Sequence, residues 1–263
     1  MSRLLQLRSR ASLARAGIAL MALLSLPATA ATPATSCQPQ ITDARYSAPT
    51  TRYAHGVLGD AIEYGALEVS FTLRGECKSD TTSAAITLPD SLVFEDIAPR
   101  LWDVDGDTLP EVVAVESSLT EGARLTVWTL ADGELTRLAS TPHIGQAYRW
   151  LAPIGAADLD GDGAIEIAYI DRPHLAKLLR VWRYSDGELQ LVAEGRGLTN
   201  HRIGDRMISS DLRVCEGKPT LITANSNWTQ IIGTTLDADG LASRALGPLR
   251  TPEGVFDTSV CGG

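Results

Sequence analysis

Two short acidic segments hold the residues whose types and spacing are best suited to chemistry. In each segment, carboxylates occupy the first, third, fifth and ninth positions, and the seventh residue can offer its backbone carbonyl. The positions are Asp103, Asp105, Asp107, Leu109 and Glu111 in acidic loop 1, and Asp158, Asp160, Asp162, Ala164 and Glu166 in acidic loop 2. Ca²⁺ binds six to eight oxygen ligands, so this spacing predicts two Ca²⁺ sites, one in each loop.

An alternative interpretation of these loops is a pair of Asp/Gly turns whose acids are simply solvated. The two loops recur 55 residues apart, and the repulsion among closely spaced carboxylates favours a bound cation. Mg²⁺ fits less well, because it keeps several of its waters and avoids sites made only of protein ligands. The β-branched runs that follow Glu111 and Glu166 read as strands, which argues against an EF-hand between two helices.

The segments around the acidic loops form an internal repeat. Two runs rich in β-forming residues, one containing Trp128 and the other Trp182, each lead into an Asp-Gly pair, at Asp132 and at Asp186, and the offset is 54 residues. A third copy reaches Asp239, and a fainter first copy reaches Asp90. Two β-patterned runs joined at Asp-Gly predict a β-hairpin, and a repeat of this period is typical of propeller blades.

We therefore expect an all-β fold, a β-propeller of four-stranded antiparallel blades in a single domain over residues 31–263. The acidic loops would join the first two strands of the middle blades, and the short terminal segments 41–46 and 255–260 read as strands that could close the ring or complete a fifth blade. The four recognisable blades are predicted at residues 53–96, 97–142, 150–196 and 203–249.

The outer blades carry decayed versions of the acidic loop. In the first, Asp60 and Glu68 keep the end positions, but Ile62 and Tyr64 replace the acids between them. In the fourth, Arg213 follows Asp211. We expect no metal at either place.

The strand, acidic loop and strand of the middle blades resemble the FG-GAP/VCBS repeats of integrin α-subunit propellers and of many exported bacterial proteins. The last acidic position departs from the family, where Asp is usual, because it is Glu111 or Glu166 here. The resemblance implies a propeller stabilised by Ca²⁺ that binds proteins or sugars, often without catalytic activity.

The loops at the opposite ends of the predicted blades gather basic and aromatic residues within an otherwise acidic chain. Such loops on a rigid scaffold often carry function, so we expect a surface there for an anionic or carbohydrate ligand. Packing between blades, or a metal site built from histidines, are the alternatives. The candidate residues are His55, Tyr148, Arg149, Trp150, Arg172, His174, His201, Arg202 and Trp228.

These patterns favour a non-catalytic binding or adhesion module for a protein or carbohydrate ligand. A structural or assembly protein of the cell envelope is the first alternative. A propeller hydrolase is the second, with His201 and Asp205 or His174 and Asp171 as acid–base pairs. No nucleophile or metallohydrolase motif supports the hydrolase.

The first 30 residues read as an export signal, since four arginines precede the apolar run 17–26 and small residues follow it. Export, periplasmic or secreted, would favour two disulfides. The pairing preferred is Cys37 with Cys77 and Cys215 with Cys261, although three pairings are open.

The charge of the chain argues against binding to nucleic acid, and its hydropathy argues against a membrane span. Without residues 1–30 the formal charge changes from −9 to −13, because four arginines are lost, and this excess disfavours nucleic acid. No run after the export signal approaches the roughly 20 apolar residues that a membrane span needs.

Overall fold

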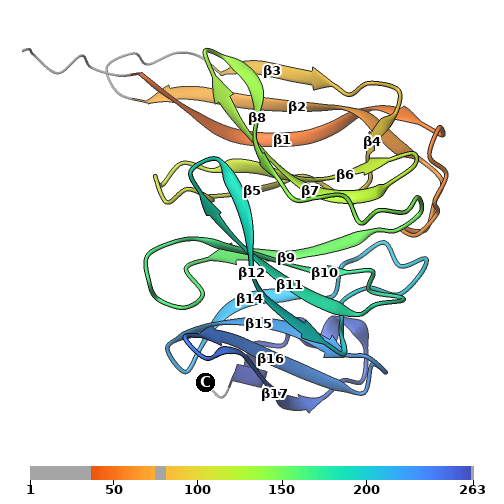
Figure 1. Ribbon diagram of the computed structural model, residues 1–263, viewed down its shortest axis with the longest axis vertical. Helices are drawn as coiled ribbons and strands as arrows, with labels where there is room; N and C mark the ends of the chain where they lie inside the picture. Colours follow the sequence, from red (N-terminus) through yellow and green to blue (C-terminus); the bar gives the residue numbers. More distant parts are fainter. Residues whose placement is uncertain (1–36, 75–80, 262–263) are drawn as a thin grey trace, which may run out of the picture. The chain divides into compact units, whose positions relative to one another are not determined.

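The computed structural model describes residues 37–74 and 81–261, and within these ranges the fold is all-β (Figure 1). The strands pair antiparallel throughout the pairings described. Two short 3-10 helices near the C-terminus complete the regular structure of these ranges. The predicted export signal lies outside the described residues. No helix in the described ranges has the length and apolar character to cross a membrane.

The middle of the chain forms a four-stranded antiparallel sheet, in the order β9-β10-β11-β12. It falls within the predicted range 150–196. Its strands are β9 (Leu151–Ala157), β10 (Glu166–Asp171), β11 (Leu178–Ser185) and β12 (Glu188–Arg196). Asp186 and Gly187, both at positive φ, form the turn between β11 and β12, as the Asp-Gly signal predicts.

The preceding strands, β4 to β8, belong to an eight-stranded sheet that also contains the three N-terminal strands, and here the first strand of the repeat is interrupted. Two short segments, β4 and β5, pair with the same strand, β6, and β7 and β8 follow. The bounds are β4 (Leu92–Phe94), β5 (Arg100–Trp102), β6 (Glu111–Ser118), β7 (Gly122–Ala131) and β8 (Glu134–Ser140). Residues 95–99, between β4 and β5, therefore lie outside the strands.

The last sheet repeats this interruption with a longer insertion. Segments β13 and β14 both pair with β15, and residues 200–210 lie between them. The strands are β13 (Leu198–Thr199), β14 (Asp211–Cys215), β15 (Lys218–Asn225), β16 (Gln230–Asp237) and β17 (Gly240–Pro248).

The N-terminal part does not form the four-stranded blade predicted at 53–96. Instead β1 (Gln38–Thr50), β2 (Glu63–Arg74) and β3 (Thr82–Thr87) form a three-stranded unit with β2 in the centre, and residues 51–62 contain no strand. The hairpin predicted at Asp90 is wrong, because β3 pairs with β2 whereas β4 pairs chiefly with β6. The predicted strand 41–46 lies inside β1.

The C-terminal strand predicted at 255–260 is also wrong. The segment forms η1 (Pro252–Phe256) and η2 (Thr258–Cys261), with proline in the first turn. Val255 is buried among residues of β15 and β16. Its apolar side chain, part of the pattern that suggested a strand, therefore packs against the last sheet. The predicted Cys215–Cys261 disulfide is confirmed and joins η2 to β14. Cys77, the partner predicted for Cys37, lies outside the described residues.

The sheets stack in chain order because their central strands are buried on both faces. In β6, Val113 and Val115 pack in the same core cluster as Leu151 and Ile167, whereas Val112 and Ala114 pack in a cluster with residues of β2. Strand β10 divides its side chains in the same way between the sheets before and after it. The final strands β3, β8, β12 and β17 contact one another in that order (Figure 1). This layering is what repeated sheets require to cover their apolar faces.

Candidate metal loops and ligand hollow

Acidic loop 1 connects β5 to β6, and its own backbone holds the carboxylates inward. The N–H groups of Gly106 and Thr108 donate to the two oxygens of Asp103, at 2.8 and 3.0 Å. Gly106 and Thr108 both have positive φ, which allows the chain to wrap around the Asp103 side chain. The Asp107 N–H donates to Asp105 Oδ1 at 3.1 Å.

Acidic loop 2, between β9 and β10, repeats this geometry. The N–H groups of Gly161 and Gly163 donate to Asp158 at 2.7 and 3.0 Å, and the Asp162 N–H donates to Asp160 at 3.2 Å. The two loops are far apart in the sequence, yet they have the same hydrogen-bonding pattern. The common conformation follows from the common spacing of Asp and Gly.

The structure brings three of the predicted ligands together in each loop. One carboxylate oxygen from each of Asp103, Asp105 and Glu111 lies within 4.8 Å of the others. The same holds for Asp158, Asp160 and Glu166. Both groups could hold a metal ion, and carboxylate oxygens are the ligands of a hard cation such as Ca²⁺. Asp107 and Asp162 are not part of these groups; each accepts the N–H of the seventh residue, Leu109 at 2.7 Å and Ala164 at 2.9 Å.

Each group contains one buried glutamate at the start of a central strand. Glu111 Oε2 accepts the Val104 N–H at 2.9 Å, and Glu166 Oε2 accepts the Leu159 N–H at 2.8 Å. Burial, followed by the neighbouring Asp105 and Asp107, raises the pKa of Glu111 to about 7. Within the described part of the chain, no Lys or Arg forms an ion pair with Glu111. A divalent cation would compensate this charge, so the residues of loop 1 fit a Ca²⁺ ion.

The second loop contains a basic residue that the sequence analysis missed. Arg183 Nε donates to Glu166 Oε1 at 2.6 Å. Arg183 lies on β11 directly opposite Glu166 of β10, so the strand register places it there. Its position next to Trp182, one strand away from a predicted ligand, is the signal that could have revealed it.

Six of the nine predicted ligand residues line one hollow of about 270 Å³, which we call the ligand hollow. These come from the segment before β2, the loop before β9 and the loop between β10 and β11. They are His55, Tyr148, Arg149, Trp150, Arg172 and His174. Val57, Pro173, Leu175 and Ile203 complete the lining.

Buried polar groups hold the aromatic side of the ligand hollow in place. Trp150 Nε1 donates to the Glu95 carbonyl at 2.8 Å, and the Tyr148 N–H donates to the Tyr53 hydroxyl at 2.5 Å. The rings of Tyr53 and Tyr148 stack with centroids 4.9 Å apart. His55 Nδ1 bonds to the fully buried Glu95 carboxylate. The sequence analysis missed Tyr53 and Glu95, which are buried and hydrogen-bond to the residues that line the hollow.

His201 is buried below the ligand hollow rather than in its lining. Its Nε2 donates to the Asp205 carbonyl at 2.9 Å, which leaves Nδ1 as the acceptor for His174 Nε2 at 2.9 Å. His201 is therefore a neutral ring that accepts from His174 and donates to Asp205. Burial, then His201 and His55, lowers the pKa of His174 to about 4. Burial also lowers the pKa of His201.

Arg202 and Trp228 are not brought into the ligand hollow. The Arg202 guanidinium lies 4.4 Å from the centroid of the Trp228 ring, a cation–π contact. Trp228 packs at the edge of the core cluster around β15 and β16. These two residues form a separate pair between the β13–β14 insertion and the β15–β16 loop.

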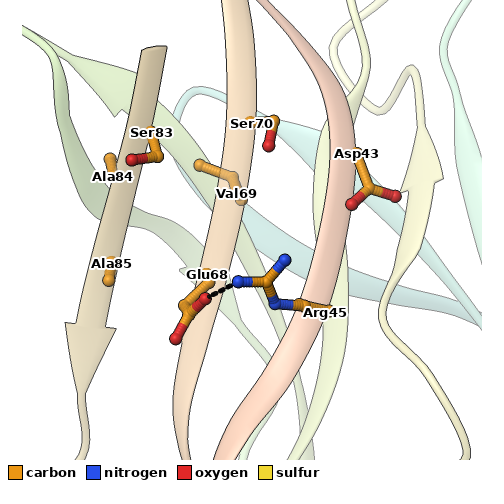
Figure 2. Close-up of a pocket in the computed structure, with 8 residues that line it drawn as sticks. All are labelled: Asp43, Arg45, Glu68, Val69, Ser70, Ser83, Ala84 and Ala85. Carbon is orange, nitrogen blue, oxygen red and sulfur yellow. Dashed lines mark hydrogen bonds and ion pairs between the residues drawn. The ribbon is translucent and has the colours of Figure 1, made fainter. Parts of the chain in front are cut away.

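A second hollow, of about 230 Å³, lies on the surface of β1, β2 and β3 (Figure 2). Its two long charged side chains, Arg45 and Glu68, form an ion pair with each other. Ser83, Ala84 and Ala85 leave the depression because their side chains are short. Since its charges are already paired, this surface is less suited to a charged ligand than the ligand hollow.

Comparison with known families supports the repeat. Residues 103–169 match the family model of the FG-GAP-like repeat, and this range includes both acidic loops. The chain therefore contains an FG-GAP-like repeat. No curated protein sequence matches the chain.

Proposed function

We propose that the protein is an exported, non-catalytic binding module, a Ca²⁺-stabilised β-propeller that recognises another protein through the ligand hollow. The observation that carries this proposal is the convergence of six predicted ligand residues on one hollow. The FG-GAP-like repeat at 103–169 supports a propeller-like binding module.

The propeller part of the proposal concerns how the stacked sheets meet. The segment before β2 reaches across to the last sheet, where the Gly204 N–H donates to the Val57 carbonyl at 3.0 Å. Gly59 is packed so closely against Gly204 that a Cβ atom there would lie 2.7 Å from the Gly204 carbonyl oxygen. This contact between the first and last parts of the stack favours a closed arrangement, which removes exposed sheet edges.

Calcium has a structural role in this proposal. Asp103, Asp105 and Glu111 would bind the ion in loop 1, and the corresponding residues are candidates in loop 2. Each loop joins the first two strands of its sheet, so a bound ion would fix the connection between them. Export is supported by the Cys215–Cys261 disulfide, because such bonds persist in oxidising compartments.

The chemistry of the ligand hollow favours an acidic peptide segment with an apolar side chain. Three apolar side chains at the hollow are exposed to solvent, Tyr148 by 49%, Leu175 by 65% and Ile203 by 72%. Arg149 donates to the Tyr148 carbonyl but has no carboxylate partner within the described residues. An acidic residue of the ligand would pair with Arg149, while its apolar neighbour covers the exposed side chains. A carbohydrate is the alternative ligand.

A hydrolase is the second candidate, and one observation favours it. The bond from His55 Nδ1 to the Glu95 carboxylate would orient the imidazole as a general base at the hollow. The lining of the hollow contains no serine or cysteine that could act as a nucleophile. Turnover of ester, phosphoester and glycoside reporters that is lost in His55→Gln would favour this candidate over the binding module.

A random peptide display library and a glycan array, each probed with the protein, test the binding module. We expect peptides that combine acidic and apolar residues to be enriched, and Arg149→Glu to reduce their binding at least tenfold. Arg45→Glu, in the other hollow, is the matched control and should bind as the wild type does. Enrichment of glycans alone would support the carbohydrate alternative, and enrichment of neither class would contradict the proposal.

A further inference from the structure

The two acidic loops differ in what faces their carboxylates. In loop 2, three nitrogens of the Arg183 guanidinium contact three different candidate ligands. Nε lies 2.6 Å from Glu166 Oε1, one terminal nitrogen lies 2.7 Å from Asp160 Oδ2, and the other lies 2.9 Å from Asp162 Oδ2. The guanidinium therefore pairs with two members of the group that could hold a metal, Asp160 and Glu166, and with the neighbouring Asp162.

Loop 1 has no such cation among the described residues. Trp128 of β7 corresponds to Trp182 of β11 in the repeat, so Thr129 stands where loop 2 has Arg183. A hollow of about 140 Å³ is lined there by Thr129 together with the candidate ligands Asp105, Asp107 and Glu111. This space is large enough for an ion and a bound water.

For electrostatic reasons, a Ca²⁺ ion and the Arg183 guanidinium cannot occupy acidic loop 2 together. Arginine keeps its proton at any physiological pH, and its planar fork suits carboxylate oxygens. A Ca²⁺ ion entering loop 2 would have to break three ion pairs of Arg183, two of them charge-assisted hydrogen bonds, and would meet a positive group beside its ligands. In loop 1 the same ion would meet uncompensated carboxylates.

We propose that Arg183 takes the place of the metal in acidic loop 2, so that the chain binds one Ca²⁺ ion, in acidic loop 1. This inference rests on the proposed function, in which loop 1 is a Ca²⁺ site. It replaces the expectation of two equivalent sites with one metal-stabilised sheet and one sheet stabilised by its own arginine. The β9–β12 sheet would then keep its loop structure when Ca²⁺ is removed.

Calorimetric Ca²⁺ titration of the chelator-treated protein tests the inference by stoichiometry. Since exported modules commonly bind Ca²⁺ with Kd values of about 10⁻⁴ to 10⁻³ M, the titration extends to about 10 mM. We expect one site in the wild type, two in Arg183→Thr and none in Thr129→Arg. The substitutions exchange the residues that the two loops already carry, so each variant is the matched control of the other.

Two results would overturn the inference. Two sites of similar affinity in the wild type would contradict it while leaving the proposed Ca²⁺ binding intact. A folded Arg183→Thr variant that still binds one ion would also contradict it. If no variant binds Ca²⁺ at these concentrations, both the inference and the proposed Ca²⁺ site fail. Should Arg183→Thr not fold, the wild-type stoichiometry and Thr129→Arg decide the question.

Discussion

His174 and His201 are joined by a hydrogen bond of 2.9 Å between Nε2 of the first ring and Nδ1 of the second. The bond links the loop between β10 and β11 to the insertion between β13 and β14. Because His201 also donates to Asp205, the pair connects two successive sheets beneath the ligand hollow. The bond requires His201 Nδ1 to stay unprotonated, because this atom is its acceptor.

Acid should weaken the protein through His174. Its pKa is about 4 in the folded state against an ordinary value of 6.5, so the unfolded state binds the proton first. The stabilising contribution is complete above pH 6.5 and is lost as the pH falls toward 4, by up to about 1.4 kcal/mol per pH unit. Urea unfolding between pH 7 and pH 4 measures this loss.

A His174→Gln variant should lose stability less steeply over this pH range. His143→Gln is the control, because His143 bonds to the Gly122 carbonyl at another place on the chain. Equal slopes in the wild type and His174→Gln would contradict the assignment.

Glu63 should impose the opposite pH dependence. Burial, followed by Glu95, Asp60 and Asp96, raises its pKa to about 9. The folded state therefore holds a proton that the unfolded state releases near pH 4.5, and stability falls as the pH rises from 4.5 to 9. The variant Glu63→Gln should gain stability relative to the wild type at pH 8 and show little difference at pH 4. A constant difference at every pH would contradict this role.

The Cys215–Cys261 disulfide should contribute strongly to the stability of the last sheet. It closes a segment with a sequence separation of 46 residues and joins η2 to β14. The double variant Cys215→Ser/Cys261→Ser should lower the free energy of unfolding by about 2–4 kcal/mol. Urea unfolding measures this loss, and Cys215→Ala/Cys261→Ala separates it from the cost of burying hydroxyls. A loss below about 1 kcal/mol in both variants would contradict the prediction.

The parts of the fold that depend on local turn chemistry could be predicted from the sequence. The Asp132–Gly133 and Asp186–Gly187 pairs adopt positive φ, and each joins two adjacent antiparallel strands. Both acidic loops likewise form from their own Asp and Gly residues. These conformations depend on neighbours in the chain, so a local pattern is sufficient to find them.

The errors arise where pairing is decided by distant residues. Leu92 pairs with Ser118 of β6 instead of forming a hairpin with β3, which no local signal at Asp90 indicates. Val255 is drawn against β15 and β16 by burial, and Pro252 begins a 3-10 turn where a strand was predicted. The sequence did not indicate the interruption between β13 and β14. Both segments are defined by pairing with β15, which follows later in the chain.

The candidate site was likewise predicted only in part. The loop positions of Tyr148, Trp150 and His174 indicated a common face, and they line one hollow. The buried Glu95 was not predictable, because only tertiary packing brings it to His55 and Trp150. Arg183 could be found only by combining its place next to Trp182 with the strand register that sets it opposite Glu166.

The central claim is that acidic loop 1 binds Ca²⁺ and stabilises the scaffold. Asp103, which accepts two loop N–H groups and belongs to the candidate ligand group, is the residue to change. Asp103→Asn should abolish the effect of Ca²⁺ on thermal unfolding. Asp60→Asn, in the decayed loop before β2, should leave it unchanged.

The most direct measurement is the melting temperature of the wild-type protein with a chelator and with excess Ca²⁺. An ion that binds only the folded state stabilises it by about 2.7 kcal/mol at 100 times its Kd. We predict a rise of several degrees in the wild type and none in Asp103→Asn. The same melting temperature in chelator and in 10 mM Ca²⁺, a concentration about tenfold above the weakest Kd expected of such a site, would contradict the claim.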